Sequence, residues 1–85
     1  MIKNKLKSLY DLNIDMNVNK TLYNVITSYD DDQLYYIMKS GIFLTEGIKL
    51  VYYGEPIGFK CVDMDSGSRG ISPLCQNIER SLKKI

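Results

Sequence analysis

The chain has 85 residues, a formal net charge of +1, 45% hydrophobic and 25% charged residues, a composition typical of a folded globular domain and not of a disordered segment. Histidine and tryptophan are absent, which excludes an imidazole base, a histidine-ligated zinc site and a catalytic Cys–His pair within this chain. At this length one hydrophobic core is expected, and we predict a single compact domain over residues 1–85.

Three helices are expected in the N-terminal half. The first covers residues 2–12, and the alternation over residues 14–18 predicts a short strand or an extended link after it. The second helix is expected to begin after Asn19, a competent N-cap. The third is expected after Asp30, with Asp31 and Asp32 in its first turn, and to end at Gly41. The apolar residues that define the three core faces are Ile2, Leu6, Leu9, Tyr10, Leu22, Val25, Ile26, Tyr29, Leu34, Ile37 and Met38.

Beyond Gly41 the apolar period changes from that of a helix to that of a strand. Residues 48–53 and 57–62 predict a hairpin around 54–56, with a further strand from 42–45 or 14–18. Ser72 as N-cap and Pro73 in the first turn predict a last helix. The predicted fold class is therefore α+β: three N-terminal helices, an antiparallel β-hairpin extended to a small three-stranded sheet, and a C-terminal helix. The expected core positions of this half are Ile48, Leu50, Tyr52, Ile57, Phe59, Cys61, Leu74, Cys75, Ile78, Leu82 and Ile85.

The two cysteines, Cys61 and Cys75, lack the CxxC spacing of a metal or redox motif. No secretory signal and no apolar run of membrane-spanning length is visible. We therefore expect two free thiols in the reducing cytoplasm, with a Cys61–Cys75 bridge as the less favoured alternative.

Two clusters are candidates for ligand sites. The run Asp30-Asp31-Asp32 lacks the alternating ligands and distal glutamate of a calcium loop, so helix capping accounts for it. Ser68, Arg69 and Gly70 form a candidate anion-binding loop, because glycine lets the backbone approach an anion and the arginine supplies charge. The spacing of a phosphate-binding P-loop is not met, and a plain surface loop is the favoured reading. No catalytic residue, metal or cofactor is predicted.

Seven tyrosines are the most suggestive feature of the sequence. Tyr36 and Tyr53 point away from the predicted core faces. The second face of the hairpin is expected to carry Lys49, Val51, Tyr53, Lys60, Val62 and Met64. Large amphipathic rings at a surface are typical of binding hot spots. We predict a non-catalytic protein-binding module (an inhibitor, adaptor or accessory subunit) with Tyr36, Val51, Tyr53 and Met64 as contact residues. The partner is a protein of unknown identity, a homodimer is an alternative, and no membrane contact is expected.

The composition, rich in Ile, Lys, Asn, Asp and Tyr, is typical of AT-rich coding and suggests a phage or mobile element of a low-GC bacterium. A winged-helix-like nucleic-acid-binding regulator is the alternative function. It would use Lys3, Lys5, Lys7, Lys49, Lys60 and the basic terminal helix. The three aspartates at the start of the third helix oppose it, because they would repel phosphate.

Overall fold

The computed structural model describes residues 1–64 and 72–85 and contains helices and strands in the order α-α-α-β-β-β-α. The predicted α+β layout is confirmed, and residues 42–45 supply the third strand of the sheet. The elements are α1 (Ile2–Asp11), α2 (Met16–Ser28), α3 (Asp31–Ser40), β1 (Ile42–Thr45), β2 (Ile48–Tyr52), β3 (Phe59–Asp63) and α4 (Pro73–Leu82).

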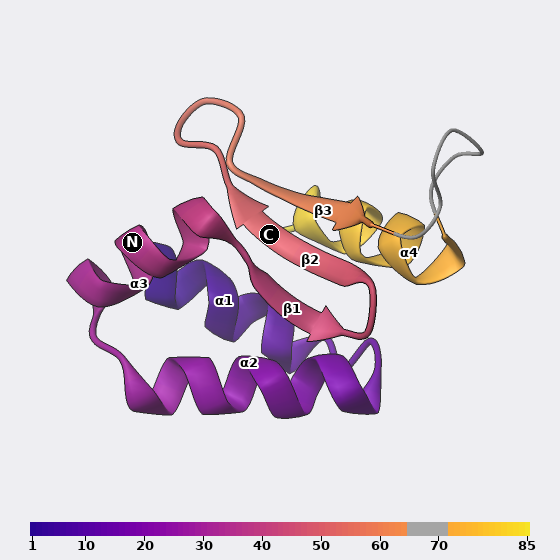
Figure 1. Ribbon diagram of the computed structural model, residues 1–85, viewed down its shortest axis with the longest axis horizontal. Helices are drawn as coiled ribbons and strands as arrows, with labels where there is room; N and C mark the ends of the chain where they lie inside the picture. Colours follow the sequence, from indigo (N-terminus) through magenta and orange to yellow (C-terminus); the bar gives the residue numbers. More distant parts are fainter. Residues whose placement is uncertain (65–71) are drawn as a thin grey trace.

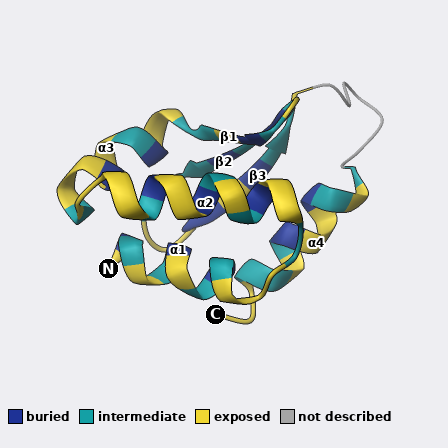
Figure 2. Cartoon of the chain, turned by 90° about the horizontal axis from the view of Figure 1, so that it is seen from below, coloured by how far each residue is buried: buried dark blue, intermediate teal, exposed yellow. Residues whose placement is uncertain are grey.

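The helices lie on one side of the sheet (Figures 1 and 2). Helix α2 packs against β1, α3 against β2 and α4 against β3, while α1 contacts α2 and α3. Every helix and every strand contributes a buried apolar side chain to one continuous core. The strands alternate, so Leu44, Ile48, Leu50, Phe59 and Cys61 face this core and their neighbours face the other way.

The sheet is an antiparallel meander of strand order β1-β2-β3. Leu50 lies opposite Ile42 on one side and opposite Cys61 on the other. A register shift between Phe43 and Thr45 marks a bulge in β1. This register fixes which side chains meet on each face of the sheet.

The predicted start of the second helix was wrong. Helix α2 begins at Met16, because Asp15 is its N-cap: one carboxylate oxygen accepts hydrogen bonds from the backbone N–H groups of Asn17 and Val18. Residues 16–18 are therefore helical and form neither a strand nor a link. Val18 is fully buried and continues with Leu22 and Val25 as one helical face, a period that the local alternation had hidden.

Helix α3 has the predicted cap. The Asp30 carboxylate accepts the N–H of Gln33, and the Gln33 side chain accepts the N–H of Asp30, which completes a capping box. Asp31 has a second role, because its carboxylate accepts the backbone N–H of Lys3 at 2.9 Å. Helix α1 has no side-chain cap of its own at Met1, so α3 caps α1 across the fold.

Two expected core residues of the C-terminal half lie at the surface instead. Ile57 belongs to the β2–β3 connection and Ile85 follows α4, and both are exposed. Tyr29, expected on the core face of α2, is also partly exposed at the helix end. The last helix starts as predicted, with the Ser72 hydroxyl accepting the N–H of Cys75 and Pro73 in the first turn.

The prediction of two free thiols was wrong. Cys61 of β3 and Cys75 of α4 form a disulfide, with their Cα atoms 5.6 Å apart. Both residues face the core, so the fold brings together two thiols that the sequence separates by 14 positions. The thiol argument for a reducing compartment therefore no longer holds. Within residues 1–64 and 72–85, no helix has the length and apolar character needed to cross a membrane.

Candidate functional site

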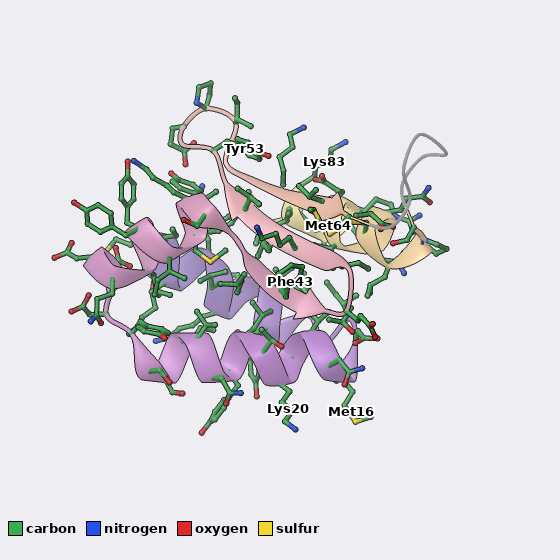
Figure 3. All side chains as sticks on the ribbon, viewed as in Figure 1. Met16, Lys20, Phe43, Tyr53, Met64 and Lys83 are labelled. Atoms are coloured by element: carbon green, nitrogen blue, oxygen red, sulfur yellow. A yellow bond between two sulfur atoms is a disulfide. The ribbon has the colours of Figure 1, made fainter. Side chains whose placement is uncertain are left out.

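The face of the sheet that points away from the helices is open to solvent (Figure 3). Phe43, Tyr53 and Met64 lie on it and are each 55–57% exposed. Lys60 is exposed, and Lys49, Val51 and Val62 are half-buried by their neighbours within the sheet. We call this set of seven residues the open face: Phe43, Lys49, Val51, Tyr53, Lys60, Val62 and Met64.

The register arranges the apolar side chains of the open face as a stripe. Val51 lies opposite Lys60, and Val62 lies opposite Lys49, so the two valines occupy one diagonal of a square and the two lysines the other. Tyr53 follows Val51 along β2, and Met64 follows Val62 at the end of β3, where its N–H donates to the Gly47 carbonyl. The apolar stripe therefore runs Tyr53–Val51–Val62–Met64, with one lysine on either side.

The open face carries positive charge only. Asp63 is the one acid within the three strands, and its carboxylate turns to the helix side, where it accepts the N–H of Ser72. The Lys49 ammonium lies 5.3 Å from the centroid of the Phe43 ring, a distance at which a cation is attracted by a ring face. No salt bridge to Lys49 or Lys60 is present among the described residues.

A helix side chain binds one backbone group at each edge of the sheet. At β1 the hydroxyl of Thr21 in α2 donates to the Leu44 carbonyl at 3.2 Å. At β3 the carboxylate of Glu79 in α4 accepts the N–H of Cys61 at 3.2 Å. Each contact uses an edge backbone group that an added strand would need, so a partner meets the open face more readily than an edge.

Three of the four predicted contact residues come together and the fourth does not. Val51, Tyr53 and Met64 all belong to the apolar stripe. Tyr36 is 75% exposed on α3, and its ring contacts Tyr35, which packs edge-on against Tyr52 on the helix side of the sheet. Tyr36 therefore lies on a different surface. The candidate anion-binding residues Ser68, Arg69 and Gly70 lie outside the described residues.

Sequence reasoning missed Phe43 as a surface residue. Its signal was present, because Phe43 stands between Ile42 and Leu44 in a segment named as a candidate strand. Alternation places a residue between two core residues on the opposite face. The rule applies to Phe43 only if residues 42–45 form the third strand, and the sequence left residues 14–18 as an alternative.

Two hollows also lie on the surface, and Lys60 is the open-face residue that lines one of them. A groove of about 310 Å³ between α1 and α2 is lined by Lys7, Tyr10, Asp11, Tyr23, Ile26 and Thr27. A second hollow, of about 280 Å³, separates the β2–β3 connection from the end of α4, and residues 5, 55–60, 79, 82, 83 and 85 line it. Neither holds a group of three or more His, Cys, Asp or Glu side chains that could bind a metal among the described residues.

Lys5 and Glu55 line the second hollow and form a salt bridge there, with Lys5 Nζ 2.9 Å from Glu55 Oε1. The hydrogen bond from Lys5 and its charge lower the pKa of Glu55, and the same hydrogen bond raises the pKa of Lys5. Desolvation and the nearby Glu55 charge raise the pKa of Tyr52, whose hydroxyl donates to Glu55. These shifts favour protonated Lys5, protonated Tyr52 and ionised Glu55 at neutral pH. The cluster therefore has the character of a structural tether and not of an acid–base pair.

No protein-family model, curated protein or solved structure matches this chain.

Proposed function

We propose that this chain is a non-catalytic binding protein that captures a protein partner on its open face. The observation that carries the proposal is the apolar stripe Tyr53–Val51–Val62–Met64, exposed at Tyr53 and Met64 and half-buried at the valines, on the face of the sheet that the core does not use. Contiguous apolar side chains with a polar surround are typical of interaction sites. An inhibitor, an adaptor or an accessory subunit would each act in this way.

The absence of histidine excludes catalysis by an imidazole base of this chain. Several acidic side chains and both cysteines within the described residues are used in structure: Asp15 and Asp30 cap helices, Asp31 caps α1, Glu79 binds an edge N–H, and the thiols are bridged. Surface complementarity therefore accounts for the exposed groups better than a reaction centre does.

Affinity capture with matched tyrosine variants tests the proposal. Biotinylated protein is incubated with lysate of the source organism, and captured proteins are quantified by mass spectrometry. Tyr53→Ala should reduce recovery of the partner about tenfold, because an exposed aromatic anchor is lost. Tyr23→Ala is the matched control, since Tyr23 and Tyr53 are each 55% exposed and Tyr23 lies on α2.

Tyr36→Ala tests the remaining predicted contact residue in the same experiment. Loss of the partner in Tyr36→Ala but not in Tyr53→Ala would move the site to the surface of α3. Equal recovery with all three variants would contradict binding through either tyrosine surface.

Nucleic-acid binding is a second candidate function, and the two lysines of the open face favour it. Helix α3 opposes the winged-helix hypothesis, because Asp31 and Asp32 in its first turn would repel phosphate. Lys39 of the same helix lies over the Tyr35 ring, 4.4 Å from its centroid. Titration of duplex and single-stranded DNA at increasing salt separates the two functions. Steep loss of affinity with salt supports nucleic acid, and absence of binding at low salt removes it.

A further inference from the structure

We infer that the open face accepts an amphipathic helix of the partner that carries acidic residues on both sides of an apolar ridge. The inference rests on the proposed function and names the chemistry and form of the partner segment. Its basis is the register of β2 and β3, which places Lys49 and Lys60 on opposite sides of the apolar stripe.

The helix contacts at both sheet edges favour a helix over an extended segment as the occupant. A strand binds a sheet by pairing with edge N–H and carbonyl groups, and Thr21 and Glu79 already use such groups at β1 and β3. On the face of the sheet, the backbone groups of the strands are paired with each other. A partner segment that lies on this face must therefore satisfy its own backbone hydrogen bonds. A helix does so internally.

The dimensions of the stripe fit a short helix. From Tyr53 to Met64 the stripe crosses three intervals of two residues, which is roughly 20 Å at about 3.4 Å per residue. A helix of about 14 residues has this length at about 1.5 Å per residue. Lys49 and Lys60 are offset along the stripe by one interval of roughly 7 Å, or about five helical residues. One carboxylate on each flank, about five residues apart, would therefore reach both lysines.

Size and charge together oppose a second copy of this chain as the occupant. Three strands at about 4.8 Å spacing give an open face roughly 15–20 Å across with its side chains. With a stripe length of roughly 20 Å the area is roughly 300–400 Å², well below the roughly 800 Å² per partner of a standard interface. Two open faces would also bring lysines against lysines. Nucleic acid is less well matched, because Val51 in the middle of the stripe separates Tyr53 at one end from Phe43 on β1. The two rings therefore form no continuous platform on which successive bases could stack.

The test uses a designed probe peptide. The probe has 18 residues, a leucine ridge at helical spacing and glutamates on both flanks, and its twin has lysines in place of the glutamates. Binding to ¹⁵N-labelled protein is followed by amide chemical shifts. The acidic probe should shift residues of β2 and β3 on the open face and should bind at least about tenfold more tightly than the basic twin.

Charge reversal provides the decisive comparison. The double variant Lys49→Glu/Lys60→Glu should bind the acidic probe at least about tenfold more weakly and should prefer the basic twin. The matched control, Lys20→Glu/Lys84→Glu, has the same change in net charge at exposed positions on α2 and after α4 and should retain the preference for the acidic probe. Thermal unfolding of both variants establishes that they fold.

Four results would overturn the inference: equal weakening in the two double variants, no probe binding to the native chain, shifts confined to the outer edges of β1 and β3, or tight single-stranded DNA binding that needs Lys49 and Lys60. Capture of a cellular partner that needs Tyr53 but tolerates Lys49→Glu/Lys60→Glu would overturn the acidic helix while leaving the proposed function intact.

Discussion

Gly41 joins α3 to β1 with a backbone conformation of φ +93° and ψ +151°. This region of backbone space is almost exclusive to glycine. The space is also occupied, because a Cβ at position 41 would lie 2.8 Å from Cγ2 of Val51, a residue of the apolar stripe. One glycine therefore permits both the tight exit from the helix and the close approach of the chain to the open face.

Gly41→Ala should lower the free energy of unfolding by about 1–3 kcal/mol, because strain and the contact with Val51 add. Gly54→Ala is the control, since Gly54 also has a positive φ (+85°) but nothing within 4 Å of a built Cβ. Urea unfolding at equilibrium measures both. If Gly41→Ala lowered the free energy of unfolding no more than Gly54→Ala, the contact between position 41 and Val51 would not add to the destabilisation.

The Lys5–Glu55 salt bridge predicts a pH dependence at both ends of the scale. The pKa of Glu55 is lowered below its ordinary value of 4.5, so its contribution to stability is present above that pH and is lost as pH falls through the folded-state value. The pKa of Lys5 is raised above 10.5, so its contribution is present below that pH and is lost as pH rises through the folded-state value. Both side chains are solvent-exposed, so the effect is small.

Glu55→Gln should therefore shift the urea midpoint downward at pH 7 and by less at pH 3, which lies below the ordinary value of 4.5, where the stabilising contribution of the carboxylate starts to be lost. Glu46→Gln, with the same change in charge in the exposed β1–β2 turn, should show no such pH-dependent difference. A Glu55→Gln deficit that is undiminished at pH 3 would contradict the ion-pair explanation.

At the scale of elements, the start of α2 shows how one side chain outweighs a local pattern. Asp15 satisfies two N–H groups at the start of the helix, which extends α2 over residues whose alternation suggested a strand. Asn19, the expected cap, lies inside the helix, and its amide nitrogen donates to the Tyr10 carbonyl and to the Asn13 side chain. It thus fastens α2 to the end of α1.

Asp15→Ala should lower the free energy of unfolding by about 1 kcal/mol, the usual cost of losing an N-cap. Asn17→Ala is the matched control, because Asn17 is exposed in the first turn and only its backbone N–H contacts the cap. Its effect should stay within about 0.5 kcal/mol. Equal effects of the two substitutions would mean that the carboxylate of Asp15 is not what starts the helix.

At the scale of the molecule, α4 is held to the rest of the chain mainly through β3. Its buried residues are Cys75 and Ile78, the Cys61–Cys75 disulfide joins it to the strand, and Glu79 binds the strand edge next to the disulfide. The disulfide closes a loop of 14 positions, and a bridge of this span restricts the unfolded chain strongly.

Replacing both cysteines, as Cys61→Ala/Cys75→Ala, should lower the free energy of unfolding by about 3 kcal/mol from the loop term, with a further loss from the packing of two buried sulfurs. Dithiothreitol should lower the stability of the native chain and leave the double variant unchanged. Mass spectrometry after alkylation without reductant should find no modified cysteine. Alkylation of both thiols in the folded protein would contradict the bridge.

The sequence by itself determined what depends on near neighbours along the chain. The period change after Gly41, the Asp30 and Ser72 caps, and the alternation that puts Val51, Tyr53 and Met64 on one face all follow from contacts within a few residues. These local rules were sufficient to predict the fold class and to place all four stripe residues on one face of the hairpin.

Only the tertiary structure decided what depends on residues far apart in the chain. It paired Cys61 with Cys75, used Asp31 of α3 to cap α1, and separated Tyr36 from the other predicted contact residues. It also set the strand register, which turns two lysines and two valines into crossed diagonals. The physical reason is that packing of the core fixes register and helix placement together, and no segment of the sequence carries that information alone.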